Sequence, residues 1–336
     1  MTTRALMIGF GSVGRALARM ICDHRERLAG LGFDFRLVGV FTRTKGSLTD
    51  PDGLDLQKML ADVEAHGKFM APSTDMTPLE ACRTLDYDVL IELSTLSIEG
   101  RGEPAASHIR AALVRGKNAV TANKGPVAFA YPELKALAER NGCKFLFEST
   151  VMDGVPVINL VQRCMKGNRI TGFSGILNST TNYILTRMEE GATLDAATAE
   201  AQKAGIAEAD PGNDVDGWDA AAKVAVLARV LMGADVTPLD VDRTGIRDVT
   251  PETIRDAAMR GKKCKLVCRG RLEDGAVRTS VRVEELEEDD ILARLSAYDS
   301  GICIESDLMV PNYIVQKDGN PGDTAYGVLE DMLSMM

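Results

Sequence analysis

Apolar and polar positions follow two patterns that alternate along the first half of the chain. Short apolar runs, typical of buried strands, lie at residues 4–10, 34–41, 88–94, 117–121 and 144–148. Between them, near residues 103–115 and 131–141, apolar residues recur with the period of an amphipathic helix. Strands that alternate with helices predict an α/β fold with a doubly wound parallel sheet and right-handed crossovers.

The second half of the chain follows a different order. Three strand-like runs at 169–176, 263–271 and 277–283 predict a second sheet. Helical patterns near 178–189, 193–204 and 216–232 predict the helices that cover it, and residues 324–335 are helical again. The acidic run at 284–290 predicts a solvated loop and the start of a helix. We therefore expect a first domain at 1–150, completed by a C-terminal helix at about 310–336, and an α+β domain at 151–309.

A glycine-rich turn stands between the first strand and the first helix. The sequence G-F-G-S-V-G comprises Gly9, Phe10, Gly11, Ser12, Val13 and Gly14. Between a strand and a helix, G-x-G-x-x-G is the fingerprint of a dinucleotide-binding site. Its glycines allow a tight turn, a close approach of the backbone to the pyrophosphate, and close packing of helix on strand. The first domain is therefore predicted to be of the Rossmann type, with the phosphates at the N-terminus of the helix.

The end of the second strand bears on which dinucleotide binds. An NAD site usually has an acidic residue there to bind the ribose hydroxyls. Asp34 begins this strand, whereas its end carries Thr42, Arg43 and Lys45. Hydroxyl groups and cations suit a 2′-phosphate, so the sequence favours NADP over NAD.

Composition narrows the class of protein. The chain has 49 Asp and Glu residues and 39 Lys and Arg residues. The resulting net charge of -10 argues against a nucleic-acid or anionic-membrane partner. Met1 leads almost directly into the first strand, so we expect no signal peptide and a cytoplasmic location. The seven scattered cysteines suggest reduced thiols. The three histidines lie far apart and each occupies a surface or helix position, which makes a zinc site or histidine acid-base chemistry unattractive.

Lysine and carboxylate chemistry is concentrated between Gly205 and Lys223. This stretch carries five acidic residues and then leads into a helix that is apolar on nearly every other face. Asp219 and Lys223 stand four positions apart, so their side chains lie on one face of that helix. Such a pair is usually a solvated ion pair. Beside a buried helix, however, it is more often kept for chemistry, and we favour a catalytic pair.

Two strand ends of the first sheet also carry polar residues. Ser94 and Thr95 follow one strand, and Lys124 follows the next, in A-N-K-G. Ligands of doubly wound sheets bind beyond the carboxyl ends of the strands, which places Lys124 where a nicotinamide would lie. A lysine in this position is as often only a solvated loop residue.

The chain resembles homoserine dehydrogenases over nearly its full length. The resemblance rests on G-F-G-S-V-G, on T-A-N-K-G at 121–125, on G-I-L-N-S-T-T-N-Y-I-L at 175–185, and on A-x-x-x-G-I-A-E-A-D-P-x-x-D-V-x-G-x-D-A-A-x-K at 201–223. These enzymes interconvert L-homoserine and L-aspartate 4-semialdehyde with NAD(P), a step towards threonine, methionine and isoleucine. The resemblance implies a homodimer or homotetramer that associates through the second sheet of a catalytic and dimerisation domain. It also leads us to expect neither a C-terminal regulatory domain nor a fused aspartate kinase.

The resemblance also implies roles for particular residues. Lys124 and Lys223 would be the active-site lysines, with Lys223 transferring the proton at the substrate oxygen, a task for which a lysine of lowered pKa is suited. Glu208 and Asp219 would hold the substrate ammonium group, with Asp214 nearby. Gly205 and Gly322 would lie against the cofactor. A monovalent cation, Na⁺ or K⁺, would bind at the loop 148–155, where the implied ligands are Glu148 and the carbonyls of Val151, Asp153 and Val155.

Two departures from the family pattern keep alternatives open. The cation loop carries Met152 and Asp153 where small residues are usual, and Ser179 stands where glycine is common. The chain could therefore be a related dehydrogenase of another small amino or hydroxy acid. A non-catalytic dinucleotide sensor is the other alternative, but such a protein would be expected to lose the pair of Asp219 and Lys223.

Overall fold

The computed structural model describes residues 2–205, 207 and 210–336. These residues form two compact units, the first comprising Met1–Pro156 and Pro321–Met336 and the second Val157–Asn320. Each unit contains one six-stranded sheet. Among the helices described, none is both long enough and apolar enough to cross a membrane.

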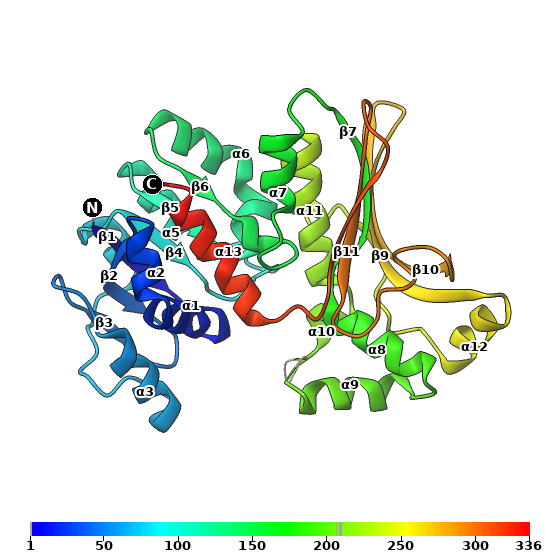
Figure 1. Ribbon diagram of the computed structural model, residues 1–336, viewed down its shortest axis with the longest axis horizontal. Helices are drawn as coiled ribbons and strands as arrows, with labels where there is room; N and C mark the ends of the chain where they lie inside the picture. Colours follow the sequence, from blue (N-terminus) through cyan, green and yellow to red (C-terminus); the bar gives the residue numbers. More distant parts are fainter. Residues whose placement is uncertain (1, 206, 208–209) are drawn as a thin grey trace. The chain divides into compact units, whose positions relative to one another are not determined.

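The first unit is built on a sheet with the Rossmann strand order (Figure 1). Its strands, in sheet order, are β3 (Ser47–Thr49), β2 (Asp34–Phe41), β1 (Thr2–Ile8), β4 (Val89–Glu92), β5 (Asn118–Thr121) and β6 (Phe145–Leu146). All neighbouring strands are parallel except β3, which runs antiparallel to β2. Because helices cover both faces, these strands are apolar nearly throughout rather than alternating.

Helices connect these strands and one returns from the far end of the chain. They are α1 (Ser12–Asp23), α2 (Arg25–Gly30), α3 (Leu56–His66), α4 (Pro78–Thr84), α5 (Ala105–Val114), α6 (Lys124–Arg140) and α13 (Pro321–Leu333), with a 3₁₀ turn at Glu148–Thr150. Helix α13 lies beside α1, and its residues Val328, Leu329 and Met332 join the core beneath β1 and β4. Helices α5 and α6 pack against each other. The last helix of the chain therefore completes the core of the first unit.

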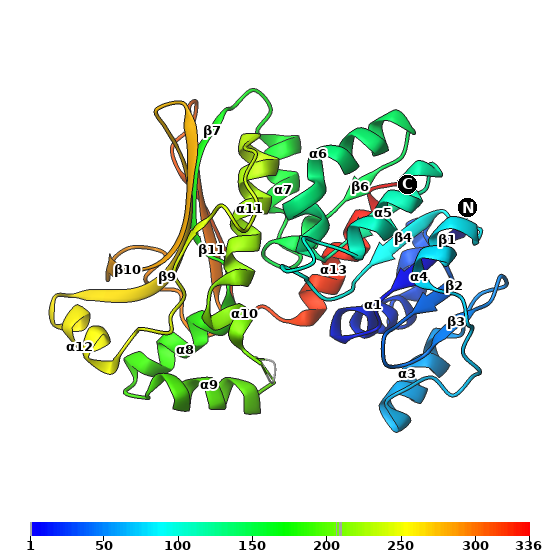
Figure 2. The ribbon, with the colours of Figure 1, turned by 180° about the vertical axis from the view of Figure 1, so that it is seen from behind.

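The second unit is an open, mostly antiparallel sheet with helices gathered on one side (Figure 2). In sheet order its strands are β12 (Asn312–Gln316), β11 (Ser300–Ser306), β7 (Ile170–Ile176), β9 (Lys262–Glu273), β10 (Ala276–Glu287) and β8 (Asp242–Arg243). Its helices are α7 (Val157–Asn159), α8 (Ser179–Glu189), α9 (Leu194–Lys203), α10 (Gly212–Val215), α11 (Trp218–Met232) and α12 (Pro251–Met259), with a π-helical turn at Leu160–Cys164. Helix α11 packs against β7, β9 and β10, and its alanines and valines from Ala220 to Ala228 are fully buried, as a helix apolar nearly all round should be.

Three sequence-based expectations about elements were wrong. The acidic run at 284–290 begins within a strand, because β10 pairs with β9 as far as Glu287 and Glu284 forms an ion pair with Arg269. The segment that returns to the first unit begins at Pro321, because β12 belongs to the second sheet. Helix α6 begins at Lys124, well before 131, because the Asn123 side chain accepts a hydrogen bond from the Gly125 N–H and caps it.

Candidate active site

The glycine turn of the first unit has the geometry of a phosphate-binding loop. Gly9 has φ +98°, and a Cβ there would lie 2.5 Å from the Leu93 carbonyl oxygen. A Cβ on Gly14 would lie 2.8 Å from the Gly9 carbonyl oxygen, so helix and strand pack too closely for any other residue. Phe10 is buried, whereas Gly11 and Ser12 are exposed and Val13 is half-buried.

The N-terminus of α1 is open to an anion. Gly11 is its N-cap residue and provides no side-chain cap, and the first turn carries no acidic residue. The amide groups of that turn are therefore not satisfied by a side-chain cap and can bind phosphate oxygens.

The turn that follows β2 presents Arg43 to solvent. Thr42 Oγ1 donates to the Gly46 carbonyl and accepts from the Lys45 N–H, so this hydroxyl fixes the turn. Asp34, at the other end of β2, accepts a hydrogen bond from the Thr2 hydroxyl. The Asp34 carboxylate is therefore hydrogen-bonded at the start of β2, away from the turn that follows the strand. Arg43 is the exposed charged side chain nearest the end of β2.

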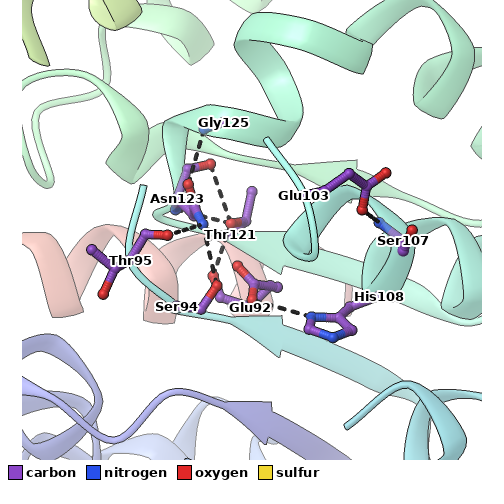
Figure 3. Close-up of polar contacts among 9 residues, drawn as sticks. All are labelled: Glu92, Ser94, Thr95, Glu103, Ser107, His108, Thr121, Asn123 and Gly125. Carbon is purple, nitrogen blue, oxygen red and sulfur yellow. Dashed lines mark hydrogen bonds and ion pairs between the residues drawn. The ribbon is translucent and has the colours of Figure 1, made fainter. Parts of the chain in front are cut away.

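The ends of β4 and β5 are joined by a network of hydrogen bonds (Figure 3). Asn123 Nδ2 donates to Ser94 Oγ at 3.3 Å and to the Thr95 carbonyl at 3.4 Å. Its Oδ1 caps α6, whose first residue is the half-buried Lys124. The structure therefore brings Ser94, Thr95 and Lys124 to one edge of the first sheet. Asn123, which joins them, was missed in the sequence, although Asn directly before a helix is a common capping residue.

The loop after β6 packs against the start of α13. Asp153 Oδ1 accepts a hydrogen bond from Thr324 Oγ1 at 2.8 Å, and Ser149 Oγ donates to the Thr324 carbonyl. Gly322, the second residue of α13, is thereby held near the same loop.

The same loop has an unusual backbone. Met152 and Asp153 both have φ +56°, the left-handed region that non-glycine residues seldom occupy. Glu148 is buried, and its N–H donates to Asp331. No cluster of three or more His, Cys, Asp or Glu side chains suited to a metal exists among the described residues. A cation here would therefore depend on carbonyl oxygens such as those of Val151, Asp153 and Val155.

In the second unit, Lys223 and Asp219 form a close pair on α11. Lys223 Nζ lies 3.1 Å from Asp219 Oδ2, and both side chains are about five-sixths buried, with 15% and 17% exposed. Lys223 Nζ also donates to the Leu177 carbonyl at the end of β7. A partly buried ion pair held by a further hydrogen bond differs from a solvated pair, as the sequence predicted.

Asn178 connects this pair to Asp214. Its Nδ2 donates to Asp214 Oδ1 at 2.7 Å and to Asp219 Oδ2 at 3.0 Å. Its Oδ1 accepts from the Thr181 N–H and caps α8. Asn178 had no role in the sequence analysis, although it opens N-S-T-T, a pattern typical of a helix start. Gly205 has φ +73°, whereas Glu208 lies outside the described residues.

The two cysteines of β9 are packing residues, as predicted. Cys264 and Cys268 are both buried. Burial raises the pKa of the Cys268 thiol to about 12, and the nearby Lys223 charge opposes that shift only in part. This thiol therefore stays protonated and is no nucleophile beside the lysine.

Comparison with known proteins agrees with these two units. The family model "Homoserine dehydrogenase, NAD binding domain" matches residues 9–148, and the model "Homoserine dehydrogenase" matches residues 156–333. The chain is 35% identical to homoserine dehydrogenase of Methanocaldococcus jannaschii over 98% of this chain and 97% of that protein. It is 36% identical to the NAD(+)-dependent homoserine dehydrogenase of Pseudomonas canavaninivorans over 97% and 94%.

Solved structures give the same result. Homoserine dehydrogenase of Thermoplasma acidophilum superimposes with a TM-score of 0.87 at 26% identity, covering 100% of this chain and 99% of that one. A hyperthermophilic archaeal homoserine dehydrogenase in complex with NADPH has a TM-score of 0.84 at 29% identity, covering 99% and 97%. The chain therefore belongs to the homoserine dehydrogenase family, the NAD(P)-dependent oxidoreductases that interconvert L-homoserine and L-aspartate 4-semialdehyde.

Proposed function

We propose that this homoserine dehydrogenase transfers the substrate proton through Lys223 and that Lys124 acts on the same substrate. The observation that carries the proposal is the pair of Lys223 and Asp219, 3.1 Å apart and largely buried. A free surface lysine would be mobile, whereas the Leu177 carbonyl and Asp219 both hold this ammonium group. A group held in one place can meet a reacting oxygen without further loss of entropy.

The chemistry needs a proton carrier and charge stabilisation. NAD(P), when bound, accepts or supplies the hydride. In the oxidation of homoserine, Lys223 acts as the neutral amine, takes the hydroxyl proton and becomes the ammonium ion. In the reduction of the semialdehyde, it returns that proton to the aldehyde oxygen. Its positive form also stabilises the negative charge that develops on this oxygen.

The carboxylates have a separate task in this proposal. Glu208 and Asp219 bind the substrate ammonium group, and Asp214 supports them. Asn178, which donates to both Asp214 and Asp219, keeps these two like charges at a fixed separation.

Glu208→Gln is expected mainly to raise KM for the amino-acid substrate, by about tenfold, because a neutral amide binds an ammonium group less strongly than a carboxylate does. Steady-state kinetics with L-homoserine would measure this. Glu200→Gln is the matched control, since Glu200 is exposed on α9 and pairs with Arg187. An unchanged KM in Glu208→Gln would remove Glu208 from the substrate site.

We propose NADP as the preferred dinucleotide. One relative is named as NAD(+)-dependent and two solved structures of relatives contain NADPH, so the choice depends on this chain's own residues. Arg43 is exposed in the turn after β2, and a guanidinium suits a 2′-phosphate better than a ribose diol.

Arg43→Ala is expected to raise KM for NADPH about tenfold and to leave KM for NADH nearly unchanged, because only NADPH carries the 2′-phosphate. Lys58→Ala, which removes an exposed charge from α3 of the same unit, is the control and should change neither value. Equal effects of Arg43→Ala on both dinucleotides would contradict the assignment.

We also propose a monovalent cation at the loop 148–155, with Glu148 and the carbonyls of Val151, Asp153 and Val155 as ligands. Its support is the left-handed backbone at Met152 and Asp153, which costs energy that a bound ion would offset. A cytoplasmic location is proposed as well, supported by the seven cysteines, all of which are free thiols in the structure.

The experiment that tests the proposed function is an assay of NADPH oxidation with L-aspartate 4-semialdehyde, with NADH in parallel, in sodium, potassium and tetramethylammonium buffers. Turnover with NADPH that exceeds turnover with NADH and falls in tetramethylammonium supports all three assignments. Tight NADPH binding without turnover would mean another substrate, as the Met152-Asp153 departure allows.

The second unit is proposed to form a homodimer, or a homotetramer built from such dimers. Large apolar side chains are exposed on β12 and the turn before it, among them Leu308, Val310, Tyr313 and Val315. Exposed apolar patches on a sheet mark association surfaces. We therefore expect light scattering to give at least twice the 36.2 kDa chain mass, and a stable monomer would contradict this.

A further inference from the structure

A buried carboxylate lies beneath the edge of the first sheet where the network of Asn123 ends. Glu92 is the last residue of β4, and its side chain is fully buried. Neither of its carboxylate oxygens has a hydrogen-bond partner among the described residues. The polar group that faces it is Nδ1 of His108, which lies 3.6 Å from Glu92 Oε1 and also lacks a hydrogen bond among the described residues (Figure 3).

The pair of Glu92 and His108 contributes little to the stability of the folded state. A buried carboxylate loses its hydration, and an attraction across 3.6 Å without a formed hydrogen bond offsets that loss only in part. Its neighbour Cys82 offers no compensation, since burial, followed by the Glu92 charge, raises the pKa of that thiol to about 12. Apolar residues of similar size would stabilise the same position at least as well. A fully buried carboxyl group without a hydrogen bond from any described residue, at a strand end, therefore calls for a functional explanation.

The backbone of Glu92 is connected directly to the polar strand ends. Its carbonyl accepts a hydrogen bond from the Thr121 hydroxyl at 2.8 Å, and Thr121 Oγ1 in turn accepts one from the Asn123 N–H at 2.9 Å. Asn123 then binds Ser94 and caps the helix that begins at Lys124. A shift of Glu92 would thus move the groups that line this edge.

His108 is connected to the same edge by a second route. It lies on α5, and the Glu103 carboxylate accepts a hydrogen bond from the Ser107 N–H in the first turn of that helix. Just before α5, Gly102 lies against the first turn of α6, since a Cβ on Gly102 would be 2.7 Å from the Gly125 carbonyl oxygen. The contact between the Glu92 and His108 side chains therefore links β4 directly to α5. The two elements are also linked through β5 and α6.

We propose that Glu92 and His108 are a buried positioning pair that holds the ends of β4 and β5 and the first turn of α6 in the geometry that receives the nicotinamide end of the cofactor. The inference rests on the proposed placement of that end near Ser94, Thr95 and Lys124. The pair touches neither substrate nor cofactor. It acts through Thr121 and Asn123.

The test uses the full-length enzyme and two readouts, the Kd of NADPH by fluorescence and kcat with L-aspartate 4-semialdehyde. Glu92→Leu and His108→Leu each leave one partner alone, whereas the double variant removes both and is expected to fold with nearly the wild-type Tm. His108→Asn retains a donor near the position of Nδ1. Glu133→Leu breaks the exposed pair with Arg110 that also joins α5 to α6, and serves as the control.

The expected result is a Kd for NADPH raised about tenfold and a kcat lowered about tenfold in the double variant, with KM for the semialdehyde within about twofold. For His108→Asn, both the Kd of NADPH and kcat should stay within about threefold of the wild-type values. For Glu133→Leu, both should equal the wild-type values. A double variant with wild-type Kd and kcat would overturn the proposal, even if the single variants unfold. So would equal losses in Glu133→Leu.

Lys124→Met in the same series separates this proposal from the proposed function. A loss of activity in Lys124→Met without any loss in the double variant overturns the positioning pair alone. Wild-type kcat and NADPH binding in both would overturn the pair together with the placement of the nicotinamide.

Discussion

Lys223→Ala is expected to lower kcat by about three orders of magnitude while the Kd of NADPH changes little. General acid-base catalysis by a positioned side chain contributes roughly 10²–10⁴-fold, and no other described group is held between Asp219 and the Leu177 carbonyl. The dinucleotide fingerprint lies in the other unit of the chain, so its binding should survive. Single-turnover kinetics with NADPH and the semialdehyde, together with a fluorescence titration of NADPH, would measure both values.

The control for this variant is Lys166→Ala, which removes an exposed lysine from the same unit and should behave as wild type. Asp219→Asn adds a second comparison. It keeps the shape of the side chain but removes the charge that holds Lys223, so a fall in kcat smaller than that of Lys223→Ala is expected. Wild-type kcat in Lys223→Ala would exclude this lysine as the proton carrier.

Gly9→Ala is expected to be the most damaging single substitution in the first unit. At φ +98° an alanine is strained, and its Cβ would lie 2.5 Å from a carbonyl oxygen of the backbone, which cannot move aside as a flexible side chain can. We expect the free energy of unfolding to fall by about 3 kcal/mol or more, and NADPH binding to be lost as the turn shifts. Thermal unfolding with and without NADPH would measure both effects.

Gly11→Ala offers a control on the same turn. Gly11 has φ -80°, and a Cβ there would meet no atom of the protein within 4 Å, so stability should be nearly unchanged. Its Cβ would point into open space at the N-terminus of α1, where the proposed pyrophosphate lies. Weaker NADPH binding at normal stability is therefore expected for Gly11→Ala. Equal stability of the two variants would contradict the strain argument at Gly9.

Much of the first sheet could be predicted because its strands are buried on both faces. Such strands give continuous apolar runs, and the run at 34–41 coincides with β2. The strands β11 and β12 were missed although each carries a short apolar run, I-C-I in β11 and Y-I-V in β12. β11 is buried between β7 and β12, and its pairing with two strands distant in sequence gives no local signal. The prediction of a loop and a helix start for the acidic run at 284–290 was wrong because the partners of its charges are distant in sequence. Glu284 and Glu285 of β10 form ion pairs with Arg269 of β9 and with Arg260 at the end of α12, and a single sequence does not show such partners.

The site was predicted as residue types rather than as a network. The spacing of Asp219 and Lys223 on one helix sufficed to predict their contact, because both residues belong to the same element. Asn178 and Asn123 were missed because each connects segments far apart in the sequence, to Asp214 and to Ser94 respectively. The pair of Glu92 and His108 was missed as well, since a carboxylate at the end of an apolar strand and a histidine on a helix give no joint signal.

The return of α13 to the first unit has a consequence for folding during synthesis on the ribosome. The dinucleotide-binding unit lacks part of its core until Pro321–Leu333 has been synthesised, and the whole of residues 157–320 is made in between. At roughly 5–20 residues per second, this delay is on the order of ten seconds or more. Throughout that time the face of α1 that will receive Val328 and Leu329 stays uncovered, and the second unit has time to fold before the first is complete. The unit that contains the first residues to emerge is thus the one whose core is completed last.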